Sequence, residues 1–313
     1  MRIFVVIDRM LKFTWKKSFL WSVLIVVLEL AAYAQNKRDD RKYVAGHLQS
    51  SLNNETSGIA ASSIHPDIFY IHNDSGDTSR FFAINAEGAL KGIFYYPPTD
   101  KKLWGAKDCE DIAVGPGPVA KQSYVYVADI GDNAELNKFV TIYRVAEPKL
   151  PAKAEANINV QSDALFLKYP DGAKDAETLM IDPIEQLIYI VTKRHKDVGV
   201  YTAPLNFKAN DTVMLTKRGM LHFRGLQPFK WIVSGDITKD GSQVVLKSYS
   251  RVYYWKREGN EPVWQTLQRK PNQPAYEQER LGEAIGFAPN GKSFYTVSEG
   301  KNQPIYHYPV PKQ

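Results

Sequence analysis

The sequence contains a single cysteine, Cys109, among its 313 residues. An intrachain disulfide is therefore impossible, and a zinc site built on paired cysteines is excluded. A chain without either must rely on its hydrophobic core, which a protein of this length can supply. Cys109 lies between Asp108 and Glu110, whose negative charges raise a thiol pKa and make the sulfur a poor nucleophile. We expect it to be a buried structural residue.

Several motifs that would indicate a particular chemistry are also missing. The sequence has no phosphate-binding loop, no dinucleotide fingerprint and no G-x-S-x-G elbow, so a serine hydrolase is not expected. The formal net charge is +6, but no run of basic residues interleaved with aromatics stands out, which argues against a nucleic-acid partner. Helical periodicity is nearly absent beyond the N-terminus. The 18 tyrosines, 14 phenylalanines, 18 prolines and 20 glycines suit short strands joined by tight turns.

The N-terminus has the organisation of a targeting segment. Residues 1–34 combine a basic start, a short apolar centre and a small-residue exit, which predicts a secretory signal peptide. The alternative is a permanent membrane anchor, but the apolar run is shorter than the roughly 20 residues that span a bilayer and contains Glu29. We expect cleavage, a secreted or periplasmic location, no membrane association afterwards, and a charged linker at residues 35–42.

An acidic motif recurs along the rest of the chain. Each copy places a carboxylate before a short apolar strand, and a second strand that ends in polar residues follows. The copies are residues 54–60, 108–113, 175–180, 234–238 and 282–286. Their spacing of roughly 45–65 residues matches a four-stranded propeller blade. The sequence therefore predicts an all-β fold, a single five-bladed β-propeller over residues 43–313.

The last blade of the predicted propeller lacks one strand, and the N-terminal end has one strand to spare. The last segment contains only three strands before the chain ends at Gln313. We expect residues 43–48 to supply its fourth strand, because this closes the ring and covers a sheet edge. The predicted domain is a ring of four-stranded antiparallel blades closed by an N-terminal strand, and we expect a monomer.

Carboxylates should gather at one mouth of the central channel. Antiparallel neighbours place the start of each first strand and the end of each second strand at the same end of a blade. Many carboxylates in one funnel cannot all stay ionised without a cation or a proton. Hard oxygen ligands suit calcium, whereas zinc favours histidine or cysteine. The candidate metal ligands are Glu55, Asp74, Glu110, Asp129, Glu177, Asp236, Glu283 and Glu299. The alternative is that these acids mainly cap the blade starts and bond backbone amides.

Basic residues are predicted on the other side of this mouth. They are Lys193, Arg194, Lys247 and Arg251. They could hold a small anionic ligand or a cell-surface component, or pair with the acids in a structural network. The candidate catalytic residues are His72, Glu110 and Glu177. Each could act as a general base beside a metal, although a lone histidine such as His72 is more often structural.

These motifs resemble those of known exported propellers. Residues 55–59, 108–113, 175–179 and 282–285 are similar to motifs of the SdiA-regulated family of five-bladed propellers. Residues 73–77, 129–133 and 169–172 resemble a related group of secreted propellers described as phytase-like or esterase-like. The resemblance covers about residues 43–313 and implies an extracytoplasmic location. It also implies metal binding at Glu55, Glu110, Glu177 and Glu283, whereas Asp236 replaces the family's glutamate in the fourth copy.

The sequence thus predicts an exported propeller with an acidic, calcium-binding mouth. The sequence shows no nucleophile paired with a general base, which favours a ligand-binding or scaffolding protein. The alternative is a calcium-dependent hydrolase of a phosphoester, lactone or glycoside, in which the metal polarises the substrate or activates water.

Overall fold

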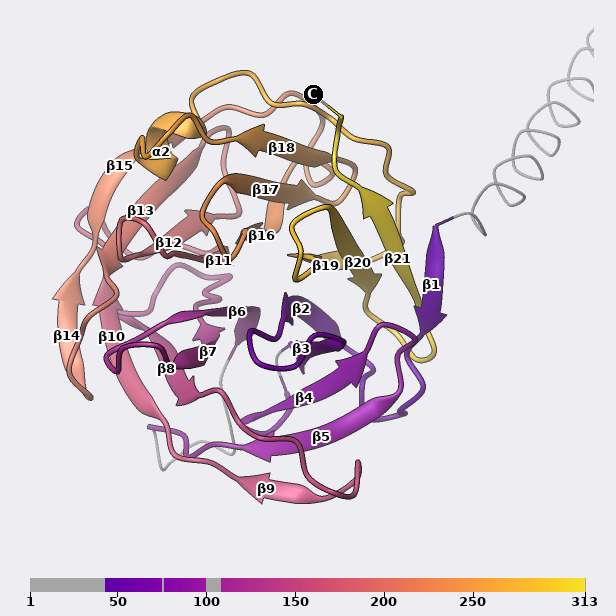
Figure 1. Ribbon diagram of the computed structural model, residues 1–313. Helices are drawn as coiled ribbons and strands as arrows, with labels where there is room; N and C mark the ends of the chain where they lie inside the picture. Colours follow the sequence, from indigo (N-terminus) through magenta and orange to yellow (C-terminus); the bar gives the residue numbers. More distant parts are fainter. Residues whose placement is uncertain (1–42, 75, 100–107, 313) are drawn as a thin grey trace, which may run out of the picture. The chain divides into compact units, whose positions relative to one another are not determined.

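Short strands with buried side chains alternate with tight turns throughout the described part of the chain. The computed structural model describes residues 43–74, 76–99 and 108–312, so the predicted signal peptide and linker lie outside the described residues. The strands form five sheets arranged around a central axis like the blades of a propeller (Figure 1). This arrangement confirms the five-bladed β-propeller.

Each blade runs outward from the axis, and its successive strands are antiparallel neighbours. The innermost strands are β2 (Thr56–Ala61), β6 (Cys109–Pro116), β11 (Ala176–Asp182), β16 (Ile232–Ile237) and β19 (Gly282–Phe287). The second strands are β3 (Ile68–Asn73), β7 (Ser123–Asp129), β12 (Leu187–Thr192), β17 (Gln243–Ser248) and β20 (Ser293–Ser298). The third strands are β4 (Arg80–Asn85), β8 (Val140–Ala146), β13 (Val198–Pro204), β18 (Val252–Lys256) and β21 (Pro304–Pro309).

A fourth strand covers the outer edge of four blades. These outer strands are β5 (Leu90–Tyr95), β10 (Asp163–Lys168), β15 (Thr216–Leu221) and β1 (Val44–His47). The last blade has the order β1-β21-β20-β19, so its outer strand comes from the N-terminal side of the propeller. Just after β1, the backbone N–H of Leu48 donates to the carbonyl of Gln303 at 2.9 Å. The predicted closure of the ring by residues 43–48 is confirmed.

The fourth blade differs from the expected four strands. Its sheet contains only β16, β17 and β18, and residues 108–312 are described without a gap. The segment that follows β18 forms the short helix α2 (Val263–Thr266) and an isolated bridge between Tyr254 and Asn272. Val263 and Leu267 join the same apolar cluster as Leu221 of β15. This segment therefore packs towards the third blade as well as covering its own.

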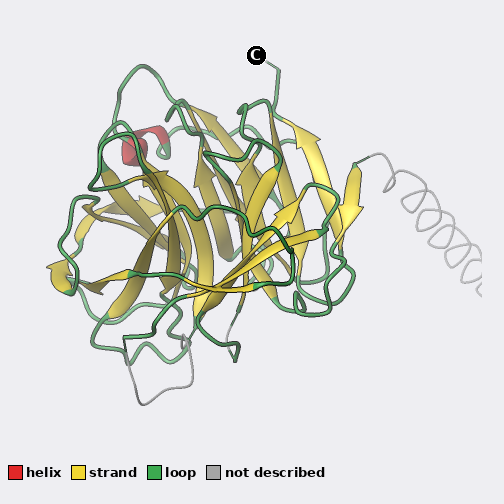
Figure 2. Ribbon diagram, turned by 60° about the horizontal axis from the view of Figure 1, so that its bottom comes forward, coloured by secondary structure: helices red, strands yellow, loops and turns green. Residues whose placement is uncertain are grey.

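Two further strands link successive blades. β9 (Asn157–Asn159) lies between β8 and β10 in sequence but pairs in parallel with β5 of the first blade. β14 (Asp211–Met214) lies between β13 and β15 but pairs in parallel with β10 of the second blade. Figure 2 shows how strands and loops make up nearly all of the propeller, with one short helix. No helix in the described residues is long and apolar enough to cross a bilayer.

The innermost strands approach one another closely around the axis. They contact each other in ring order, from β2 through β6, β11, β16 and β19 back to β2. At the β19–β2 contact, a Cβ atom added to Gly286 would lie 2.2 Å from the carbonyl oxygen of Ile59. Such proximity excludes any side chain, so glycine is required there. Apolar clusters between adjacent blades supply most of the remaining packing.

One buried ion pair joins the third and fourth blades. The guanidinium of Arg257, which follows β18, donates to both carboxylate oxygens of Asp182 at the end of β11, at 2.9 and 3.0 Å. Both side chains have no exposed surface. Each charge is therefore compensated only by its partner and a few neighbouring polar groups, which include Glu185.

We predict that Asp182→Asn lowers the free energy of unfolding by about 3–5 kcal/mol, because it leaves the Arg257 charge buried and unpaired. Urea denaturation measures the loss. The control is Lys217→Ala, which removes the half-exposed pair between Lys217 and Asp171. It should cost less than about 1 kcal/mol. Equal losses in the two variants would contradict a special role for the buried pair.

Candidate metal centre

Every innermost strand carries a β-bulge at the same point. The pairing with the second strand skips one residue just after the first pair, in β2, β6, β11, β16 and β19 alike. The skipped residues are Ser57, Glu110, Glu177, Val233 and Glu283. A bulge leaves the extra residue unpaired and redirects its side chain. All five lie at the end of the channel where the second strands finish, as the sequence predicted for Glu110, Glu177 and Glu283.

Two of the predicted ligands do not occupy this position. In the first blade the bulged residue is Ser57, and Glu55 precedes the strand with its side chain exposed. In the fourth blade it is Val233, whereas Asp236 is the fifth residue of β16 and pairs with Val245 near the start of β17.

Asp236 therefore belongs to the opposite end of the channel. Its carboxylate accepts the backbone N–H groups of Ile237 and Phe287, both at 2.8 Å. The prediction that Asp236 lies at the acidic mouth is wrong. Asp236 precedes an apolar residue, Ile237, as the motif requires, but the bulge of β16 is at Val233, three residues earlier.

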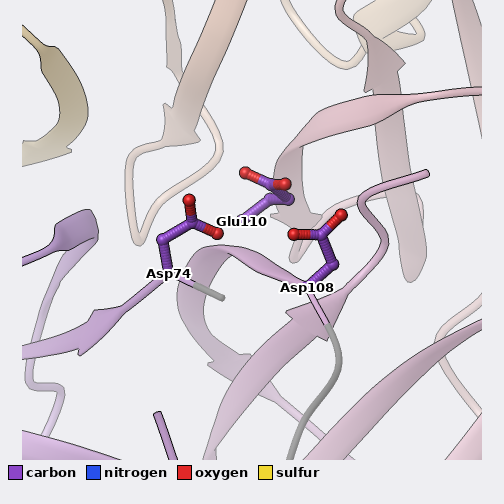
Figure 3. A group of neighbouring side chains, drawn as sticks. All are labelled: Asp74, Asp108 and Glu110. Atoms are coloured by element: carbon purple, nitrogen blue, oxygen red, sulfur yellow. The ribbon is translucent and has the colours of Figure 1, made fainter. Parts of the chain in front are cut away.

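Five carboxylates converge at the mouth. Single oxygens of Asp74, Asp108 and Glu110 lie within 4.8 Å of one another, and so do those of Asp74, Glu283 and Glu299. Figure 3 shows the first group, with the three carboxylates turned towards a common space. Asp74 belongs to both groups and joins them. We call Asp74, Asp108, Glu110, Glu283 and Glu299 the carboxylate cluster.

Asp108 was not among the predicted ligands. It stands one residue before β6, and its backbone N–H donates to Asp129 Oδ1 at 3.0 Å. Asp129 thereby holds the start of β6 and is not a member of either group. The sequence contained the signal for Asp108, because the residue opens the repeated motif, but the motif alone did not show that two of its three acids, Asp108 and Glu110, face the mouth together.

The electrostatics of the carboxylate cluster favour protons or a cation. Burial raises the pKa of Glu110 well above its usual range, and the charges of Asp74 and Asp108 add to this rise. Burial and the neighbouring Asp175 and Asp129 raise the pKa of Asp108 to about 6.

Burial, together with Glu283, raises the pKa of Glu299 to about 8. Like charges in a poorly solvated site disfavour ionisation, and a bound cation would relieve this repulsion.

A glycine makes room for two of these carboxylates. A Cβ atom on Gly131, which follows β7, would lie 2.3 Å from Glu110 Oε1 and 2.4 Å from the carboxylate of Asp108. No side chain can occupy that space while the two acids keep their positions. Gly131 therefore forms a cradle that lets Asp108 and Glu110 approach the same point.

Glu177 has a different partner. It forms an ion pair with Lys193, whose Nζ also lies 4.0 Å from Glu283 Oε1. Both partners are almost completely buried. Glu177 is therefore at the mouth, as predicted, but it is paired with a lysine and is not part of the carboxylate cluster.

Most of the basic residues predicted at the mouth form hydrogen bonds or ion pairs with other residues of the protein. Arg194 pairs with Asp175 and donates to Asn133, and Lys247 is fully buried, donating to the carbonyl of Gly282. Arg251 is exposed and donates to the carbonyl of Arg224. These contacts match the structural-network alternative for Lys193, Arg194 and Lys247.

A second polar group lies near the axis. The carboxylate of Asp111, on β6 and without exposed surface, accepts the N–H of Leu179 at 3.0 Å and the hydroxyl of Ser234 at 3.1 Å. Leu179 belongs to the third blade and Ser234 to the fourth, so Asp111 links the second blade to both of them at the centre of the ring.

His72 lies beside this central group. A Cβ atom on Gly58 would be 2.8 Å from His72 Nε2 and 2.9 Å from Asp111 Oδ1. The ring is buried, its Nδ1 contacts the carbonyl of Asn73 at 2.8 Å, and burial lowers its pKa to about 4. A neutral, inaccessible ring does not suit the general-base role considered for His72, and the structural alternative fits better.

The donor set fits a hard cation. All five members of the carboxylate cluster offer oxygen, and no histidine or cysteine belongs to either group in the described residues. Calcium takes several carboxylate oxygens in irregular geometry, whereas zinc prefers nitrogen and sulfur. Asp74, Asp108, Glu110, Glu283 and Glu299 would hold such an ion.

Searches with the sequence found no matching family model and no matching curated protein. The fold and the geometry of the carboxylate cluster are therefore the basis for inferring function.

The raised pKa of Glu299 predicts a pH-dependent stability in the presence of a chelator. A carboxyl whose folded pKa exceeds its unfolded value binds more protons in the folded state, so stability falls as pH rises between the two values. For Glu299 this window runs from 4.5 to about 8. We expect the wild type to lose stability between pH 5 and pH 8 and Glu299→Gln to lose less, as measured by urea denaturation in EDTA. Parallel pH profiles would show that Glu299 titrates normally.

Proposed function

We propose that the carboxylate cluster binds a divalent cation, with calcium favoured, and that the propeller acts as a ligand-binding or scaffolding protein. The observation that supports this most strongly is the convergence of five acids, in two groups that share Asp74, at a mouth where burial and like charges raise the pKa of Glu110 and Glu299. A bound cation would allow the acids to ionise together.

The exported location and the relationship to SdiA-regulated or phytase-like propellers belong to the same proposal. Their support is the pattern of residues 1–34 and the resemblance of the repeated motifs, together with the five-bladed fold. A calcium site suits an extracytoplasmic protein, because free calcium is plentiful there and extracellular modules bind it with modest affinity.

Calcium should stabilise the protein measurably. At about 100 times the dissociation constant, a ligand that binds only the folded state adds about 2.7 kcal/mol, which corresponds to a rise in Tm of roughly 5–10 °C for a domain of this size. We predict this rise on adding calcium to EDTA-treated protein, as measured by scanning calorimetry. The double variant Asp74→Asn with Glu110→Gln should not respond.

The matched control is Glu55→Gln, because Glu55 is an exposed acid near the mouth but outside the carboxylate cluster. It should retain the full response. If the wild type melts identically in calcium and in EDTA, the proposed cation site is refuted.

A second candidate function is a calcium-dependent hydrolase of a phosphoester, lactone or glycoside. The observation that favours it is the position of Glu299 in the carboxylate cluster, within reach of Asp74 and Glu283. Once the cation has ionised it, this carboxylate could act as a general base that accepts a proton from an attacking water. When bound, the cation would polarise the substrate or activate water.

Turnover of a phosphoester, lactone or glycoside would support this second function if it requires calcium. Glu299→Gln should then lower kcat by roughly 100-fold or more, the usual contribution of general acid–base catalysis, while calcium still raises Tm. Absence of turnover across the panel, in protein that responds to calcium, would leave only the binding function.

A further inference from the structure

Lys193 occupies an unusual position beside the carboxylate cluster. It directly follows β12, its backbone N–H donates to the carbonyl of Asp175 at 3.0 Å, and its side chain is almost completely buried. Its Nζ forms the ion pair with Glu177 and lies 4.0 Å from Glu283 Oε1. Glu177 and Glu283 are bulged residues in the same register as Glu110, so the lysine ammonium stands where two of the three bulged glutamates meet.

Aromatic rings complete the surroundings of this ammonium. Lys193 Nζ lies 5.9 Å from the ring centroid of Trp231 and 5.6 Å from that of Tyr249. Both distances are within the range in which a cation is attracted by the face of an aromatic ring. The hydroxyl of Tyr249 also donates to Glu283 and so fixes one wall of the enclosure.

The ammonium group of Lys193 does not satisfy all the carboxylate oxygens around it. Glu177 Oε2 is buried and has no hydrogen-bond partner among the described residues. An unsatisfied buried carboxylate oxygen is costly, and a multivalent cation would satisfy it better than one ammonium group. By contrast, Asp108 and Glu110 form no ion pair with any described residue, and the charge of Lys193 lowers their pKa values only in part.

We propose that Lys193 is a tethered cation that fills a second cation subsite, formed by Glu177 and Glu283 and faced by Trp231 and Tyr249. The mouth then accommodates two positive centres, of which the chain itself supplies one. Lys193 thereby limits the protein to one exchangeable divalent cation, bound by the carboxylate cluster. This limit rests on the proposed function for the first ion, whereas the subsite itself does not.

Removing the ammonium should open the subsite. We predict that Lys193→Met raises the number of bound calcium ions from one to two in isothermal titration calorimetry. Lys193→Arg should still bind one, because it keeps the charge. Arg194→Met is the matched control, since it removes a neighbouring cation that lies over Trp231 but pairs with Asp175. It should leave the number of bound calcium ions unchanged.

Terbium luminescence locates the added ion. Tb³⁺ replaces calcium at oxygen sites and emits strongly when an excited indole lies nearby, so Trp231 should sensitise an ion in the vacated subsite. We expect excitation of tryptophan to give at least about tenfold more terbium emission in Lys193→Met than in the wild type. Adding Trp231→Phe to the variant should remove most of this gain.

The outcomes separate this inference from the proposed function. If the wild type binds no calcium but Lys193→Met binds one ion beside Trp231, the subsite is supported and the proposed function is wrong. If both proteins bind one ion and the variant gains no Trp231-dependent emission, the subsite is refuted and the proposed function stands. Lys193→Gln, which keeps a hydrogen-bond donor for Glu177, replaces Lys193→Met if that variant does not fold, and the same criteria apply.

Discussion

Repulsion between carboxylates at one end of a narrow ring is the interaction around which this protein is organised. Five blades leave little room at the axis, and the shared bulge turns the side chains of Glu110, Glu177 and Glu283 into that space. Two neighbouring residues accommodate this repulsion in different ways. Lys193 neutralises the acids on one side, whereas on the other side Gly131 gives Asp108 and Glu110 room to meet without a compensating cation among the described residues. The charge left over is the basis of the cation site that we propose at this end of the propeller.

A polar contact near the axis also ties the blades together. Asp111 accepts hydrogen bonds from groups on the third and fourth blades, so it links three of the five innermost strands. Glycine at position 58 makes this contact possible, because a side chain there would collide with His72 and Asp111. Since Glu110 directly precedes Asp111 in β6, the same contact helps to hold one member of the carboxylate cluster in place.

Much of this fold was predictable from the sequence, because blade repeats are local patterns. Apolar strands with turns between them indicated five blades, and the missing strand at the C-terminus indicated closure by residues 43–48. The site was predicted less well. Glu110 and Glu283 were predicted because they follow the motif, but Asp236 was placed at the wrong end of the channel and Asp108 was not predicted. A bulge depends on the pairing register between two strands, which residue order alone does not specify. The pairing of Lys193 with Glu177 likewise depends on three-dimensional proximity across the mouth.

The parallel strands β9 and β14 have a consequence for how such a ring can change over time. Each belongs to the segment of one blade but completes the edge of the preceding one. Unlike repeats that contact only through their faces, the first three blades share backbone pairing, so deleting the second or the third blade would remove the strand that covers the edge of its predecessor. Substitutions can accumulate in these three blades, but duplication or exchange of a whole blade among them would break this pairing.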